Sequence, residues 1–145
     1  MTETYVFDTE AIIAYLYDEP GRDSVETLLT AVNSGDADGL LTETNAAEVL
    51  YLVARFEGVD ETPTSASLRT ADRDVRALER WGLDLERADW RLAGEVKADG
   101  HISLADAHAV ALAFEHDATL VVGGDDDFDA LPLDIDVLRF RAESV

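Results

Sequence analysis

The sequence contains no cysteine, and of its 11 basic side chains only Lys97 is a lysine. The absence of cysteine excludes disulfides, thiolate metal sites and cysteine nucleophiles. No apolar stretch approaches the ~20 residues that span a bilayer, and the N-terminus has no positively charged leader before an apolar run. We therefore expect a cytoplasmic protein that does not enter a membrane.

Positive charge is scarce beside the 32 acidic residues, and the net charge is −21. Such a balance ordinarily argues against a nucleic-acid partner, because phosphate binding relies on clustered Lys and Arg. Here the acids are spread over the whole chain rather than gathered in one tail. That distribution is typical of a halophilic protein in concentrated salt, where the Debye length is ~3 Å at 1 M. Most of the acids then reflect adaptation to a salt-rich solvent, and only a few of them have a role in function.

The length of 145 residues and the 47% hydrophobic content predict a single domain over residues 1–145. Short apolar runs alternate with longer segments of helical periodicity, which indicates an α/β fold. The predicted strands cover residues 4–7, 40–41, 83–85, 119–122 and 135–140. The predicted helices cover 9–17, 23–32, 44–56, 62–81, 88–98 and 103–116, with Thr62 as the cap and Pro63 in the first turn of the fourth.

Four acids stand at the edges of otherwise apolar segments: Asp8, Glu48, Asp106 and Asp125. Ligands of open parallel sheets bind beyond the carboxyl ends of the strands, and Asp8 and Asp125 each lie just past a predicted strand. They would meet if the first and fourth strands are neighbours. We expect Glu48 and Asp106, in the first turns of their helices, to point at the same crevice.

Carboxylates pushed toward a core need partners, and several of them can share one divalent cation. Ligands that are all oxygen suit Mg²⁺ or Mn²⁺ rather than zinc or copper. Such ions can activate water and stabilise the charge that develops on a phosphodiester. They would also neutralise carboxylates that otherwise repel the phosphate, so an acidic nuclease is physically reasonable.

Each acid also has a structural alternative. Asp8 can cap the first helix, and Ser103 with Asp106 is nearly a capping box, although that box prefers Glu or Gln. The aspartates at 125–129 can form a solvated turn. Glu48 is harder to explain in this way, because apolar residues surround it where the helix should face the core. The joint occurrence of the four acids favours a site.

These motifs resemble, in order along nearly the whole chain, those of the PIN domain nucleases, especially the VapC-type toxins of toxin–antitoxin pairs. The motifs are a strand ending in Asp8-Thr9, an Ala-Glu48-Val-Leu helix, Ser103-Leu104-Ala105-Asp106-Ala107, and Gly124-Asp125-Asp126-Asp127-Phe128. The resemblance implies a parallel β-sheet flanked by helices, an α/β/α sandwich that hydrolyses single-stranded RNA. It implies Mg²⁺ or Mn²⁺ bound by Asp8, Glu48, Asp106 and Asp125, with Asp127 as an auxiliary ligand. It also implies a homodimer and a small antitoxin partner that occludes the crevice.

The chain departs from the family pattern at two positions. Gly123 stands where members usually carry Ser or Thr, two residues before the last aspartate, so a hydroxyl contact near the metal is missing. Glu10 follows Asp8-Thr9, where Ser, Asn or Ala is common. Neither change removes one of the four carboxylates, so we expect an effect on rate and not on reaction class.

Two other functions compete with this interpretation. A non-catalytic RNA-binding or partner-binding module could keep the fold without turnover, and Gly123 leaves that alternative open. A phosphatase of the haloacid dehalogenase type would also place an aspartate after the first strand. That class needs a second aspartate two residues later and a lysine late in the chain, whereas this chain has Glu10 and Lys97.

Four arginines lie along one face of the predicted 62–81 helix: Arg69, Arg73, Arg76 and Arg80. They could bind an RNA backbone at the rim of the acidic crevice. The alternative is a solvated face with helical ion pairs, since Asp72 precedes Arg76 by four residues, and the spacing favours this alternative slightly.

Overall fold

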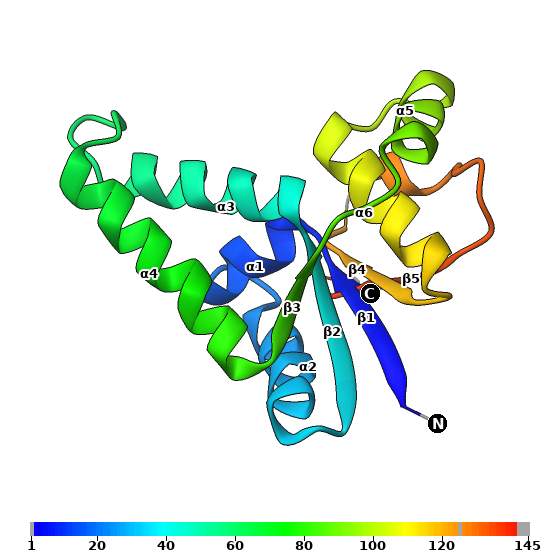
Figure 1. The fold of residues 1–145 in the computed structure, drawn as a ribbon, viewed down its shortest axis with the longest axis horizontal. Helices are drawn as coiled ribbons and strands as arrows, with labels where there is room; N and C mark the ends of the chain where they lie inside the picture. The colour runs from blue at the N-terminus through cyan, green and yellow to red at the C-terminus, as the bar shows by residue number, and fades with distance from the viewer. Residues whose placement is uncertain (1, 125, 142–145) are drawn as a thin grey trace.

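The computed structural model describes residues 2–124 and 126–141. Within them, five parallel strands form one sheet in the order β3-β2-β1-β4-β5 (Figure 1). The strands are β1 (Glu3–Phe7), β2 (Ala37–Thr42), β3 (Leu83–Glu86), β4 (Thr119–Val122) and β5 (Asp136–Arg139). The predicted neighbours β1 and β4 are paired, with Tyr5 opposite Thr119. The strand order therefore reverses between β1 and β4, which places a ligand crevice at their carboxyl ends.

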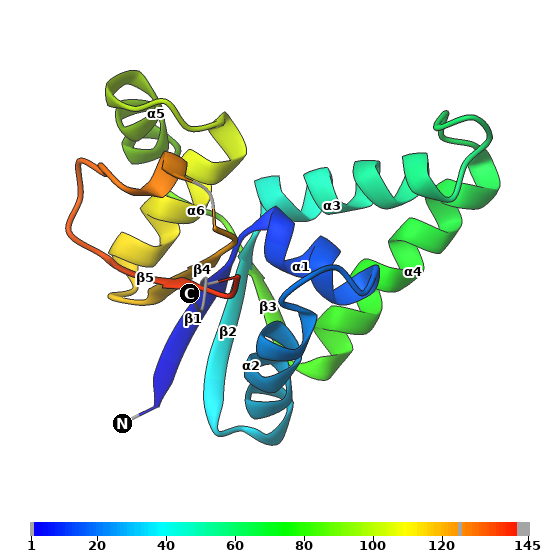
Figure 2. The same cartoon turned by 180° about the vertical axis from the view of Figure 1, so that it is seen from behind.

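Helices cover both faces of the sheet, as predicted for an α/β/α sandwich (Figures 1 and 2). They are α1 (Thr9–Leu16), α2 (Arg22–Ser34), α3 (Glu43–Phe56), α4 (Ser65–Trp81), α5 (Trp90–Asp99) and α6 (Leu104–Glu115), with the short 3-10 helix η1 (Asp126–Phe128) after β4. Among the described residues, none of the helices is both long enough and apolar enough to cross a bilayer.

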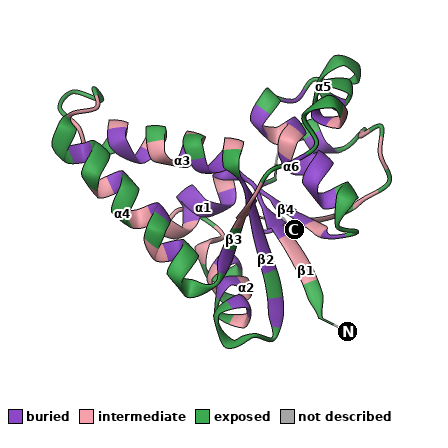
Figure 3. Cartoon of the chain, in the orientation of Figure 1, coloured by how far each residue is buried: buried purple, intermediate pink, exposed green. Residues whose placement is uncertain are grey.

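The core has two parts because successive strand residues point to opposite faces of the sheet. Phe7 and Leu41 pack into the cluster formed with α1 to α4. Their neighbours Val6 and Leu40 pack into the cluster formed with α5 and α6. Figure 3 shows the burial of β1 increasing toward its carboxyl end and β2 mostly buried. The carboxyl-terminal parts of β1 and β2 are thus buried between the two core clusters.

Helices α3 and α4 pack along each other and extend beyond the sheet (Figures 1 and 2). We call this pair the α3–α4 arm (residues 43–81). Its apolar residues Val49, Val53 and Val75 belong to the core cluster. Several large apolar side chains of the arm remain exposed, among them Tyr51, Phe56, Leu68 and Trp81.

The predicted element ends agree with the structure to within three residues, and the largest disagreements are the starts of β2 and α4. Thr62 is not its cap: the helix begins at Ser65 and is capped by Thr64. Thr64 and Ser67 form a reciprocal capping box, with hydrogen bonds of 2.8 and 3.0 Å. Thr62 instead pairs with Val59 in a tight turn. Pro63 favours a helix that starts directly after Thr62. The helix starts after Thr64 instead, because the side chain of Thr64 caps it.

Candidate active site

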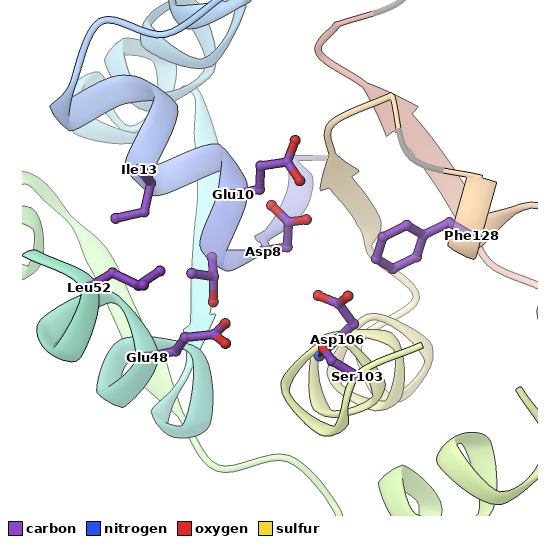
Figure 4. Close-up of a pocket in the computed structure, with 9 residues that line it drawn as sticks. Asp8, Glu10, Ile13, Glu48, Leu52, Ser103, Asp106 and Phe128 are labelled. Atoms are coloured by element: carbon purple, nitrogen blue, oxygen red, sulfur yellow. Dashed lines mark hydrogen bonds between the residues drawn. The ribbon is translucent and has the colours of Figure 1, made fainter. Parts of the chain in front are cut away.

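A pocket of about 290 Å³ opens at the carboxyl end of β1, between the N-terminal parts of α1, α3 and α6 (Figure 4). Three of the four predicted acids line it, and their side chains come from segments far apart in the sequence. Its lining consists of Asp8, Thr9, Glu10, Ile13, Glu48, Leu52, Ser103, Asp106 and Phe128. The fourth predicted acid, Asp125, lies outside the described residues.

Asp8 is both a helix cap and a pocket residue. Its backbone continues the sheet by donating to the carbonyl of Val121 at 3.1 Å, and the extended conformation at Asp8 then starts α1. One carboxylate oxygen, Oδ1, accepts a 2.7 Å hydrogen bond from the amide of Ala11. The capping alternative is therefore confirmed, but the same carboxylate also faces the pocket (Figure 4).

Burial raises the pKa of the Asp8 carboxyl well above its usual range, because Asp8 is only 2% exposed. The hydrogen bond from Ala11 opposes this rise in pKa. The nearby carboxylates of Asp106 and Glu10 raise the pKa of Asp8 further, and the Arg141 guanidinium lowers it. A buried carboxyl beside other carboxylates is a group that a cation would stabilise.

Glu48 lies in the second turn of α3 rather than in the first turn as expected: α3 begins at Glu43, directly after β2, and Glu48 is its sixth residue. It does not point into the apolar core either. It is half-buried and extends into the pocket toward the side of Asp106 (Figure 4). The apolar residues around Glu48 in the sequence therefore face other directions on the helix, and the acid itself faces the crevice.

Asp106 is in the first turn of α6, as expected. Its backbone amide donates to the Ser103 hydroxyl at 3.1 Å, so Ser103 is the helix cap. The carboxylate of Asp106 projects into the pocket from the side opposite α1 and α3 (Figure 4). The acid at this position thus lies at the positive end of the α6 dipole, which stabilises its negative charge.

A buried polar network, which we did not identify in the sequence, connects the starts of α1 and α3. The Asn45 side chain donates to the Thr9 hydroxyl at 2.9 Å, and the Thr42 hydroxyl donates to the Asn45 side-chain oxygen at 2.5 Å. All three residues are buried. Because Thr9 follows Asp8 and Asn45 precedes Glu48 by one helical turn, the network fixes these two acids relative to each other. In the sequence, the feature that indicates this network is the polar Asn45 three positions before Glu48.

The remaining predicted site residues lie elsewhere. Asp127 is exposed on η1, and within the described part of the chain it is not among the pocket-lining residues, although its neighbour Phe128 is. The four arginines of α4, all described, are exposed and do not line the pocket either. Arg76 instead forms a two-pronged hydrogen bond with Asp72 at 3.0 and 3.1 Å. The ion-pair alternative therefore holds at Arg76.

The family model of the PIN domain matches residues 5–133. The chain belongs to the PIN domain family. This membership excludes the haloacid dehalogenase alternative for the fold. A search of curated proteins finds no match.

The PIN domain fold is also found in solved structures at low sequence identity. One is VapBC2 from Rickettsia felis bound to a DNA fragment from their promoter, which is 15% identical, with a TM-score of 0.69 over 94% of this chain and 98% of that chain. DNA-bound VapBC from Salmonella typhimurium is 14% identical, with a TM-score of 0.64 over 97% and 99%. A toxin–antitoxin complex from Klebsiella pneumoniae is 17% identical, with a TM-score of 0.62 over 94% and 97%.

The donor set of this PIN domain pocket fits a hard divalent ion. Asp8, Glu48 and Asp106 offer only carboxylate oxygens, which suit Mg²⁺ or Mn²⁺. Within residues 2–124 and 126–141, no three acidic or histidine side chains are already close enough together to form a complete ion-binding cluster. The acids therefore converge on one pocket without forming a closed cage.

Proposed function

We propose that this PIN domain is a metal-dependent endoribonuclease that hydrolyses phosphodiester bonds of single-stranded RNA and serves as the toxin of a toxin–antitoxin pair. The observation that carries the proposal is the convergence of Asp8, Glu48 and Asp106 on one pocket at the strand-order reversal. Carboxylates from three separate segments repel one another unless a cation compensates them. In a protein that binds no ion, this repulsion would only lower stability, whereas with a bound ion the same carboxylates can assist catalysis.

Asp8, Glu48, Asp106 and Asp125 would hold one or two Mg²⁺ or Mn²⁺ ions, with Asp127 as an auxiliary ligand. A bound ion supplies activation of the attacking water and stabilisation of the leaving oxygen. The amide of Ala11 fixes the Asp8 carboxylate, and Ser103 orients Asp106 by capping α6. The hydrogen-bond network through Asn45 fixes the positions of Asp8 and Glu48 relative to each other. For Arg69, Arg73, Arg76 and Arg80 we propose a solvated helical face, which the ion pair of Arg76 with Asp72 favours. Contact of this row with the RNA backbone is the alternative, and the salt dependence of RNA binding tests it.

The partner proposal rests on the similar structures and on exposed apolar surface. The Rickettsia felis, Salmonella typhimurium and Klebsiella pneumoniae structures are VapBC or toxin–antitoxin complexes. On this chain, exposed large apolar residues gather on the α3–α4 arm, including Tyr51 and Trp81. Such side chains support a protein partner. We propose a small cognate antitoxin and a homodimer as the partners of this chain, with no membrane association and a cytoplasmic location.

The charge of −21 supports a halophilic habitat for the protein. Mutual repulsion of the acids is screened in molar salt, so the free energy of unfolding should rise strongly between dilute buffer and molar KCl. Chemical unfolding in the two buffers measures this rise. Equal stability in both would reject the halophilic proposal.

The test of the catalytic proposal is calorimetric titration of Mn²⁺ in molar KCl, followed by incubation with a pool of single-stranded RNA. The native protein should bind Mn²⁺ saturably and cleave RNA only with the ion present. Asp106→Asn should abolish both activities while leaving the fold intact by circular dichroism. If RNA binds equally with and without Mn²⁺ and is never cut, the chain is a non-catalytic PIN-fold binding module instead.

A further inference from the structure

Among the described residues that line the pocket, Glu10 is the acid outside the predicted set of four. It lies in the first turn of α1, two residues after Asp8, and its side chain lines the pocket with Asp8, Glu48 and Asp106 (Figure 4). In that view its carboxylate lies beside that of Asp8, on the side away from Glu48 and Asp106. A fourth carboxylate adds repulsion to a pocket that is already acidic, so its placement needs a physical reason.

The Glu10 carboxylate is paired with an arginine that follows β5, at the same carboxyl end of the parallel sheet. Phe140 extends the pairing of β5 by donating to the Val122 carbonyl at 2.9 Å, and the next residue is Arg141. Arg141 forms an ion pair with Glu10, a second one with Glu19 at 3.1 Å, and a 2.6 Å hydrogen bond to the Pro20 carbonyl. The Arg141 side chain is only 25% exposed, so this contact is partly shielded from solvent.

Gly123 makes room for this arrangement. It follows β4, and a Cβ atom at Gly123 would lie 2.8 Å from Cδ of Glu10 and 3.3 Å from Nη1 of Arg141. Any side chain there would displace the Glu10 carboxylate, although the flexible end of Glu10 can move away at little cost. The backbone at Gly123 is not in the left-handed region, among the described residues, so a larger residue would meet no backbone strain. Glycine at position 123 therefore lets the Glu10 carboxylate occupy this space.

We infer that Glu10 is an additional carboxylate of the ion-binding pocket, occupying the space that the missing side chain of Gly123 leaves at the end of β4. The inference rests on the proposed function and deepens it. Arg141 is a positioning residue that prevents Glu10 from turning to solvent. The oxygen that a side chain at position 123 could offer the pocket is supplied by Glu10 instead. Glu10 thus supports Mn²⁺ or Mg²⁺ binding either directly or through the waters of the ion.

The first test compares Mn²⁺ binding of Glu10→Gln and Glu19→Gln by calorimetry in molar KCl. Both glutamates pair with Arg141 and have nearly equal side-chain exposure, 40% and 41%, but Glu19 lies outside the pocket. Glu10→Gln should weaken Mn²⁺ binding about tenfold or more, whereas Glu19→Gln should change it less than about twofold. Equal effects of the two variants, or no effect of either, would show that Glu10 is only a structural ion-pair partner.

The second test is a double-mutant cycle between Glu10 and Gly123. Gly123→Ala should displace Glu10, so it should weaken Mn²⁺ binding to a similar extent as Glu10→Ala with little change in melting temperature. The double variant should bind no more weakly than Glu10→Ala alone. Additive losses would overturn the inference, because they would show that Gly123 acts independently of Glu10.

Asp106→Asn distinguishes a failure of the role of Glu10 from a failure of the proposed function. If this variant loses Mn²⁺ binding while Glu10→Gln retains it, the proposed function stands and the role of Glu10 fails. If Asp106→Asn binds Mn²⁺ as the native protein does, the proposed function itself fails.

Discussion

The acidic pocket and the arginine row of α4 are two charged features that teach different lessons. The row lies on one helix, and its spacing alone places it on one face. The pocket is assembled from α1, α3 and α6, whose acids are far apart in the sequence. Charge on one helical face is easily explained by local ion pairs such as Arg76 with Asp72. Convergence of carboxylates from distant segments has no such local explanation.

The largest expected effect lies in the pocket. Asp106→Asn should reduce RNA cleavage in Mn²⁺ by about 100-fold or more, because it removes a carboxylate that the ion needs. Cleavage of a labelled single-stranded RNA pool measures the rate. Asp99→Asn, at the exposed end of α5, removes the same charge and should leave the rate within about twofold. Equal losses in both variants would mean that overall charge, and not the pocket, controls the rate.

The buried network beside the pocket should matter next. Asn45→Ala removes the donor to the buried Thr9 hydroxyl and the acceptor of the buried Thr42 hydroxyl, although Thr42 still accepts from the backbone amide of residue 45. It should therefore lower the free energy of unfolding by about 1–3 kcal/mol. Urea unfolding measures the change. The exposed Asn33→Ala on α2 is the control, with an expected change of less than about 0.5 kcal/mol. A network that contributes nothing would give the same small change at Asn45.

The raised pKa of Asp8 gives the pocket a pH dependence. In the metal-free protein, the folded chain keeps a proton on Asp8 at pH values where the unfolded chain has lost it. Stability should therefore fall as the pH rises from the ordinary carboxyl range toward the raised pKa of Asp8. Asp8→Asn should flatten this fall, and asparagine can still cap α1. Urea unfolding over a pH series tests the slope, and an unchanged slope would contradict the assignment.

Proton release should accompany ion binding for the same reason. An ion that needs the Asp8 carboxylate must displace its proton, so Mn²⁺ affinity should increase as the pH rises through the raised pKa of Asp8. Calorimetry in buffers of different ionisation enthalpy counts the protons released. Binding without proton release would place the ion away from Asp8.

The smallest effect is expected from the arginine row. Arg73→Gln combined with Arg76→Gln should leave the salt dependence of RNA binding unchanged, because Arg76 is already paired with Asp72 and neither arginine lines the pocket. Filter binding over a series of KCl concentrations measures the slope. If the plot of log affinity against log salt concentration instead became less steep by about 0.7 for each arginine removed, the row would contact the RNA backbone.

The sequence by itself determined the order and type of the elements, because hydrophobic periodicity is a local property of the chain. It also pointed to Asp8, Glu48 and Asp106, because hydrophobic patterning alone places them beside predicted strands and helix starts. It placed the start of α4 wrongly, since the competition between Thr62 and Thr64 depends on side-chain hydrogen bonds that only form in three dimensions.

Only the tertiary structure decided which of these groups meet. The parallel pairing of β1 with β4 brings the starts of distant helices to one edge, and the contacts there join residues as far apart as Glu10 and Arg141. The network through Asn45 and the space above Gly123 are likewise products of packing. Such contacts depend on the relative positions of whole elements, which sequence spacing within any one element does not encode.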